Sequence, residues 1–237
     1  MQLKHYFFLA TILPLLFACK KPSTIVEQPV LIKSIQKQGE SCVTFCTYDN
    51  QNRLLAASQC STLESYQYFT DSIVYRRTIS GGLDYQYTYF LASNGLATSY
   101  KRYDNTTTTT NFSYEYDANK FRTSWKDLSN NSNYKESIIS NNNIVNETSA
   151  SIIPSGNYTI SSIFFKDEKN TLGTTYLGRL FLGSSSTNLK KAENWSTPDG
   201  DFSMQFSYNK DDKERVTKRV TRLNGKDTNE VRFYSYY

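Results

Sequence analysis

The chain has 237 residues, a formal net charge of +5 and 38% hydrophobic residues, and its apolar content leans on 19 Tyr and 14 Phe. The single histidine, His5, lies inside an apolar leader, so the mature chain lacks the imidazole that Ser–His–Asp and Cys–His nucleophiles or a His-ligated metal site require. The small net charge, with acids interspersed among the bases, also argues against a nucleic-acid-binding surface.

Residues 1–18 have the pattern of a removable signal peptide. The apolar run from Tyr6 to Phe17 suits a signal-peptide core and is shorter than the roughly 20 residues of a membrane-spanning helix. It ends in the sequence LFAC, which resembles the lipobox of bacterial lipoproteins. We therefore expect cleavage before Cys19 and attachment of palmitate and other acyl chains to it; the alternative is an ordinary secretory leader with Cys19 as a bystander.

The next residues, 19–28, contain Pro, Ser and charge but no aromatic residue, and predict a lipid-anchored tether. Residues 29–237 then form a single β-sheet domain, which we expect to be a monomer. A membrane contact through the N-terminal lipid and an outer-membrane location follow from the anchor. The sequence does not decide between the periplasmic and the surface face.

Three cysteines follow the anchor, in a compartment that permits disulfides. Residues 42–48 and 53–59 predict an antiparallel hairpin, whose register places Cys42 opposite Cys60. Cys42 and Cys46 are four residues apart along a strand, about 13 Å, which is beyond disulfide reach. We expect a Cys42–Cys60 disulfide with Cys46 as a free buried thiol, and keep open the alternative of three reduced cysteines packed as small hydrophobic residues.

A sequence pattern recurs along the chain: alternating aromatic residues, an Asp/Asn turn, then Arg or a hydrophobic residue. It occurs at residues 44–54, 112–122 and 206–216, with Asp49, Asp117 and Asp211 at the same place. Period-two aromatics make one face of a strand, and the Asp/Asn cluster makes the turn. Further strand and turn signals every 8–14 residues or so predict an all-β antiparallel meander that forms one large curved sheet.

Residues 171–191 differ from the rest because they carry the densest aliphatic cluster of the mature chain. A sheet with one apolar face needs a cover. We therefore expect this segment to form a short helix or loop that covers the apolar face.

The Tyr-x-Tyr-Asp-x-x-x-Arg pattern resembles the YD-type repeats of bacterial surface proteins. Together with the lipobox, the segment KNTLGTTYLGRLFLGSSSTNLKK and the closing FSYNKDDKERVTKRV and FYSYY, it makes residues 30–237 similar to a family of Bacteroidota lipoproteins whose domain has no assigned function. The resemblance implies a curved antiparallel sheet on an exported lipoprotein and carries no catalytic residues.

No pair of carboxylates stands out as a catalytic pair, and most acids lie beside turn residues, where they cap the backbone. We expect neither an enzyme nor a metal site nor a cofactor. Trp125 and Trp195 lie in polar sequence surroundings, where an exposed indole can stack on a sugar; the alternative is that both pack at the sheet rim. The sequence thus predicts a non-catalytic envelope lipoprotein with a structural or interaction role, whose partner is a glycan or an envelope protein; the alternative is a glycan-binding surface lipoprotein.

Overall fold

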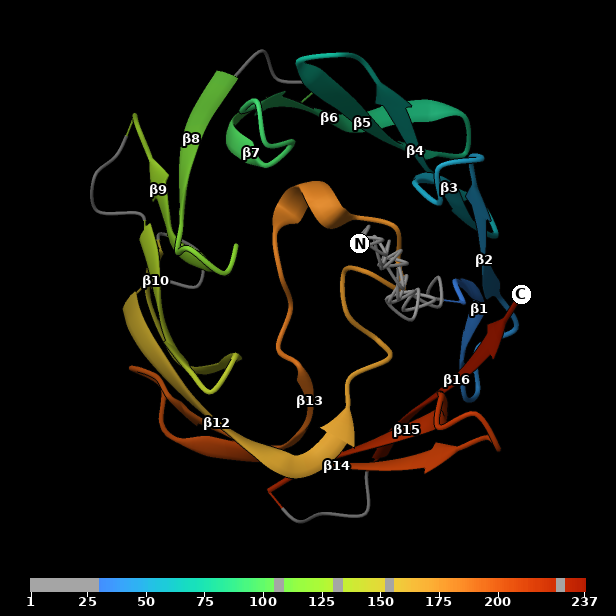
Figure 1. Ribbon diagram of the computed structural model, residues 1–237, viewed down its shortest axis with the longest axis vertical. Coiled ribbons are helices and arrows are strands. Elements are labelled where there is room, and N and C mark those ends of the chain that lie inside the picture. Colours follow the sequence, from blue (N-terminus) through green and yellow to red (C-terminus); the bar gives the residue numbers. More distant parts are fainter. Residues whose placement is uncertain (1–29, 105–108, 130–133, 152–155, 225–228) are drawn as a thin grey trace, which may run out of the picture.

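The computed structural model describes residues 30–104, 109–129, 134–151, 156–224 and 229–237, and they form a closed barrel of antiparallel strands (Figure 1). Its elements are β1 (Ile32–Lys37), β2 (Val43–Tyr48), β3 (Leu54–Gln59), β4 (Thr62–Tyr68), β5 (Ser72–Ile79), β6 (Gly82–Leu91), β7 (Ala97–Asp104), β8 (Thr109–Tyr116), β9 (Arg122–Asp127), β10 (Tyr134–Ser140), β11 (Asn143–Ser151), β12 (Gly156–Lys169), the short 3-10 helix η1 (Leu180–Leu182), β13 (Asn188–Ser196), β14 (Phe202–Lys210), β15 (Val216–Leu223) and β16 (Asn229–Tyr236).

Each strand pairs with its neighbours in sequence, and β1 pairs with β16 through Ile35 and Tyr234, which closes the ring. The prediction of an open curved sheet is therefore wrong. The physical reason is that an open sheet would leave the backbone groups of β1 and β16 unpaired at two edges, whereas closure pairs them with each other. The antiparallel meander itself is present, because every ladder joins consecutive strands in antiparallel register.

The three Asp turns predicted from the recurring pattern share one geometry. The Asp49 carboxylate accepts the backbone N–H of Arg53 at 2.9 Å, and Asp117 and Asp211 do the same for the residues four positions later at 2.8 and 2.9 Å. The residue before that donor is left-handed in each turn, with φ of 62°, 66° and 59° at Asn52, Lys120 and Glu214. All three turns lie at the same end of the barrel.

Most of the alternating aromatic residues of β4–β9 face the inside of the barrel, while others, such as Phe45 and Phe90, face outward. Phe181, in the segment that runs through the lumen, contacts Tyr66 and Tyr89 with ring centroids 6.4 and 5.1 Å apart, which identifies their face as the inner one. Tyr75 and Tyr100, which pair with these residues in register, are buried on the same face. The core of the protein is therefore the lumen itself.

Residues 170–187, here called the plug, cross the lumen between β12 and β13 (Figure 1). The expected helix over an open face is wrong: the plug has one 3-10 turn, and residues 188–191 belong to β13. A closed ring has no outer apolar face to cover, so the aliphatic residues fill the inside instead. Phe181 packs into a cluster with β2–β8, and Leu172, Tyr176 and Leu177 pack against Ile32, Leu189, Val216 and Tyr234.

Backbone contacts hold the plug against the turns at one end. The N–H of Leu54 donates to the carbonyl of Gly178 at 3.1 Å, and the N–H of Ser184 donates to Lys120 at 2.8 Å. The N–H of Val216 donates to the hydroxyl of Thr171 at 2.9 Å. Each of the three Asp turns thus supplies a plug contact within five residues of its Asp.

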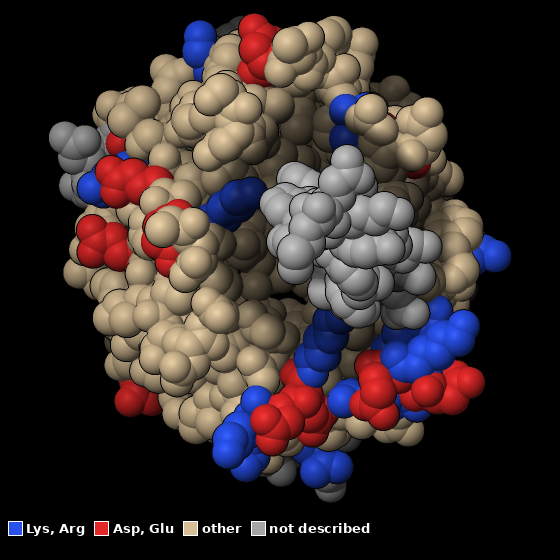
Figure 2. Space-filling model, in the orientation of Figure 1, with Lys and Arg blue, Asp and Glu red and all other residues tan. Residues whose placement is uncertain are grey.

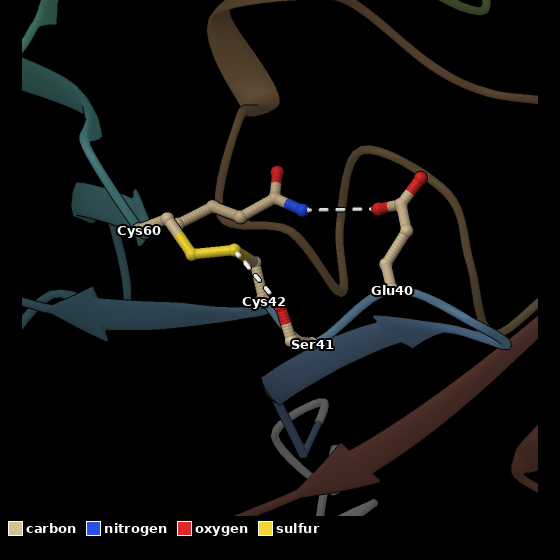
Figure 3. The surroundings of a disulfide bond; sticks show 5 residues. Glu40, Ser41, Cys42 and Cys60 are labelled. Carbon is tan, nitrogen blue, oxygen red and sulfur yellow. Dashed lines mark hydrogen bonds between the residues drawn. A yellow bond between two sulfur atoms is a disulfide. The ribbon is translucent and has the colours of Figure 1, made fainter.

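At the opposite end, Cys42 and Cys60 form a disulfide with Cα atoms 5.6 Å apart (Figure 3). The hairpin register differs from the expected one by a residue, because a bulge lies between Thr47 and Tyr48 and Cys46 pairs with Ala57. Both half-cystines lie just beyond the end of this ladder, where they still reach each other. Cys46 is a free thiol on the inner face and is buried.

The close approach of the plug to the turn between β2 and β3 predicts that position 178 requires glycine. Gly178 has φ of +64°, and a Cβ there would meet the Asn52 carbonyl at 2.6 Å and the Leu54 nitrogen at 2.8 Å, so Gly178→Ala should lower the free energy of unfolding by about 2–4 kcal/mol. Gly95→Ala, with a similar φ of +79° but open space around it, should cost about 1 kcal/mol. Urea unfolding measures both, and equal losses would contradict a close-packed plug.

Candidate functional site in the barrel lumen

The inner wall formed by β4–β9 is a continuous stack of aromatic rings. Tyr100 and Phe112 lie 4.4 Å apart with planes 11° apart, and Phe112 and Trp125 lie 4.8 Å apart at 20°. Tyr87 extends the stack towards β5, 5.1 Å from Tyr100 and 5.5 Å from Tyr75. These rings are opposite or diagonal neighbours across strands, where aromatic pairs stabilise a sheet by up to about 1 kcal/mol each.

The plug joins this wall through a charged contact as well as an apolar one. The Arg179 guanidinium lies 5.2 Å from the Tyr66 ring centroid, and its Nη2 donates to the Glu64 carboxylate at 3.1 Å. Phe181 inserts two residues later between Tyr66 and Tyr89. The β4–β9 half of the lumen is therefore occupied by the plug and by its own side chains.

The lumen holds a vestibule at the end where the plug meets the turns. This cavity has a volume of about 1430 Å³ and is lined by the turn residues Asn94, Asn119 and Asn142 and by plug residues 183–187. Figure 2, in the orientation of Figure 1, shows basic side chains inside the central recess and charged side chains around the rim. The lining also includes apolar side chains such as Phe121 and Leu180 and the charged residues Lys169 and Arg215.

A second cavity, of about 730 Å³, lies between the plug and the inner face of β13–β16. Its apolar lining includes Leu177 from the plug and Met204 and Phe206 from β14. Its charged lining includes Arg219 and Glu230, which form an ion pair of 3.1 Å. We name this the β13–β16 cavity. Its size lies within the 300–1,000 Å³ or so of typical ligand sites, and it combines an apolar wall with few charges.

The two tryptophans singled out from the sequence do not lie together. Trp195 lies on the inner face near the end opposite the plug, between the rings of Tyr158 at 5.5 Å and Phe202 at 5.3 Å, and its N–H donates to Glu193 at 3.2 Å. Tyr158 and Phe202 come from the strands on either side, so they cover both faces of the indole. This stacking gives no support to a sugar platform on Trp195.

Trp125 is a member of the aromatic stack of β4–β9. One face of its indole lies on Phe112, and its N–H donates to the Tyr100 hydroxyl at 3.3 Å. It is half-buried on the inner face of β9. Glycan contact through Trp125 or Trp195 stays a prediction, and any such contact would be made inside the barrel.

The lumen also contains charged residues that the sequence analysis did not single out, chiefly Arg179, Arg219, Glu230 and Arg232. The signal for the last three is present in the sequence, because they alternate with Val220 and Val231 on neighbouring strands. Without the ring closure, nothing in that alternation shows which face is enclosed. Among the described residues, no group of three or more His, Cys, Asp or Glu could hold a metal ion.

Comparisons with known proteins identify the architecture. The chain matches no protein-family model and no curated protein sequence. It is similar in structure to a porin-like protein from Bacteroides uniformis, with a TM-score of 0.67, 15% sequence identity, and coverage of 89% of this chain and 97% of the other. A porin-like protein from Bacteroides vulgatus gives a TM-score of 0.60 and 12% identity over 88% and 99% of the two chains.

At these identities the comparisons show the fold alone. Both neighbours come from Bacteroides, and the likeness concerns the shape of the barrel. They do not test the lipid anchor, and residues 1–29, which carry the signal peptide and tether predictions, lie outside the described residues. No helix within the described ranges has the length and apolar character needed to cross a membrane.

The buried tyrosines predict a steep alkaline unfolding. Burial raises the pKa of Tyr68, Tyr116 and Tyr236 to about 12, and it raises that of Tyr66 as well. Because these phenols have higher pKa values when folded, their stabilising contribution is complete below the unfolded pKa of about 10 and is lost as the pH rises towards the folded values. As the pH is raised from 10 to 12, the urea concentration at the midpoint of unfolding should therefore decrease. Tyrosinate absorbance at 295 nm should increase over the same pH range.

Matched variants separate buried from exposed phenols. Tyr66→Phe should make the alkaline decline shallower, whereas Tyr103→Phe, on the outer wall, should leave its slope nearly unchanged. The explanation fails if the tyrosines ionise near pH 10 while the barrel stays folded.

Proposed function

We propose that the protein is a non-catalytic envelope protein that acts by binding a partner rather than by conducting solutes. In this proposal the barrel lies in water outside the bilayer, and lipid on Cys19 holds it near the outer membrane. One observation carries this proposal. Many aromatic side chains, among them Tyr66, Tyr89 and Tyr100, face the lumen, and the outward positions mix polar and charged side chains with separate apolar ones. A membrane-spanning barrel instead presents a continuous apolar band to lipid.

The outer face can be followed strand by strand. Beside the inward rings of Tyr87 and Tyr100, the outward positions of β6 and β7 include Gln86 and Lys101, and β8 turns Glu115 outward. Glu115 accepts a hydrogen bond from the neighbouring outward residue Ser124 at 2.8 Å. Charges and amides at mid-strand positions would be costly against lipid hydrocarbon.

Apolar side chains on the outer face are spaced apart among polar ones. Phe45 and Leu63, exposed by 53% and 42%, lie in one cross-strand row with Ser58 between them, and Ile138 on β10 has the outward polar residue Asn146 opposite it. Eleven of the sixteen strands in the described residues have six to eight residues, below the 9–11 or so of a membrane-spanning strand. The spacing of the apolar side chains and the shortness of the strands both favour a barrel whose outer face contacts water rather than lipid.

The plug supports binding over conduction. It crosses the lumen and bonds to turns of β2–β3, β8–β9 and β14–β15, so it narrows any aqueous path through the barrel. The name porin-like describes the two structural neighbours and their shape. For this chain we infer an envelope location from the leader together with that fold.

The anchor is tested by changing the residue that would carry it. Cys19→Ala should move the protein from the membrane fraction to the soluble periplasmic or extracellular fraction, because without acyl chains the polar outer wall has no strong affinity for lipid. Immunoblots of fractionated cells measure this, with Cys46→Ala as a control that leaves the fractionation unchanged. A Cys19→Ala protein that still resists carbonate extraction would indicate a barrel embedded in the bilayer.

Conduction is tested on purified protein in planar lipid bilayers. We expect no discrete conductance steps at concentrations where an authentic porin from the same membrane, run in parallel, gives them. Regular conductance steps from this protein would overturn the proposal that the barrel lies outside the bilayer and does not conduct solutes, whatever the result of the fractionation.

A further inference from the structure

We propose that the end of the barrel at which the vestibule opens, here called the vestibule end, is the surface that contacts the lipid of the outer membrane. The opposite end carries the Cys42–Cys60 disulfide, and this disulfide end points away from the bilayer. The inference rests on the proposed function, because it takes lipid on Cys19 as the anchor and adds which end of the barrel that anchor holds.

The tether joins the barrel at the vestibule. Val30, which follows the tether in the chain, lines this cavity. Two residues later, the N–H of Ile32 donates to the carbonyl of Tyr176 in the plug at 3.0 Å, and the carbonyl of Leu31 accepts the N–H of Tyr237 at 3.2 Å. The plug and the C-terminal residue therefore both fix the point at which the tether is attached.

The tether is short relative to the barrel. Val30 lies eleven positions after Cys19, which a flexible chain spans by roughly 20 Å and a fully extended one by at most about 40 Å. The eight residues of β5 extend for about 26 Å along the strand, and the usual tilt of barrel strands reduces this to a height of about 20 Å. The relaxed length of the tether thus equals about one barrel height.

This comparison favours the vestibule end as the membrane-facing one. With the disulfide end on the membrane, Val30 would lie at least one barrel height from the bilayer. The plug narrows the path through the lumen, and the path around the outside includes the crossing of the rim before the descent along the wall. The tether would then be held close to full extension, which costs conformational entropy. The vestibule end reaches the membrane without this cost.

The rim of the vestibule end exposes apolar side chains that suit a lipid interface. Leu180 on the plug is 62% exposed, Phe69 in the β4–β5 connection 49% and Tyr237 60%. Side chains of these types insert at the boundary between lipid headgroups and acyl chains. Ile79 and Leu83 are exposed near the disulfide end as well, so the rim supplies a contact and the tether decides which end makes it.

The test places a fluorophore at either end of the lipidated full chain. Ala118→Cys puts a thiol in the β8–β9 turn at the vestibule end, and Asp199→Cys puts one in the β13–β14 turn at the disulfide end; both positions are exposed. Cys46 is buried, and the unsubstituted protein measures its background labelling. The NBD-labelled proteins are bound to phosphatidylethanolamine–phosphatidylglycerol vesicles that contain a lipid with a nitroxide on its headgroup, which quenches at short range.

We expect the nitroxide lipid to quench the label at position 118 several-fold more strongly than the label at position 199. Equal quenching at the two positions, stronger quenching at position 199, or no quenching at either position in protein that floats with the vesicles would overturn the inference.

A lengthened tether tests the cause. A Gly/Ser linker of about 30 residues inserted between Gln28 and Pro29 adds roughly 30 Å of relaxed length, more than the height of the barrel. The difference in quenching between the two positions should then decrease, because the anchor no longer restricts which end approaches the membrane. Replacement of residues 20–28 by Gly and Ser at unchanged length is the matched control and should preserve the difference. An undiminished difference with the long linker would refute the tether as the determinant.

Flotation separates this result from that of the proposed function. Protein that fails to float with the vesicles is not held by lipid, and the anchor and the orientation then both fail. If the Cys19→Ala protein floats as well, the barrel itself is embedded and the proposed function fails. If only the lipidated protein floats and its two ends are quenched equally, the proposed function stands and the orientation alone is refuted.

Discussion

The structure depends on filling a wide barrel whose inner face is apolar. An eight-stranded barrel can fill its interior with wall side chains alone, but a sixteen-stranded one is too wide for opposite walls to meet. Water in such a lumen would lie against Tyr75, Tyr89, Tyr100 and Phe112, all buried in the structure. The plug resolves this conflict, because Phe181 and the leucines around it bring a second apolar surface to the wall.

The recurring Asp turns make that filling specific. In each turn the Asp carboxylate accepts a hydrogen bond from the backbone N–H four residues later. The residue just before that donor has a positive φ angle, which lets the chain reverse direction. The next strand then begins with a backbone group that reaches the plug, as the N–H groups of Leu54 and Val216 do. A repeated sequence motif therefore acts twice, as a hairpin connection and as an attachment point for the plug.

The local elements could be predicted from the sequence because their causes are local. Alternating Tyr and Phe predict strands, and Asp49, Asp117 and Asp211 predict turns, without reference to distant residues. Ring closure could not be predicted, because it depends on Ile35 meeting Tyr234 across almost the whole chain. The same limit hid the inner face of the lumen. Arg219 and Arg232 have the sequence pattern of surface residues, and only ring closure places their face inside. Residues 171–191 are expected to cover an open sheet until there is a lumen for them to fill.

The two halves of the lumen differ in a way that bears on function. Along β4–β9, ring stacks and the plug residues Arg179 and Phe181 occupy the space, and Arg179 pairs with Glu64. Along β13–β16, the plug offers Leu177 and leaves a cavity of about 730 Å³ in front of the ion pair between Arg219 and Glu230. The asymmetry therefore leaves room beside the plug along β13–β16, whereas the β4–β9 half is filled by packed rings.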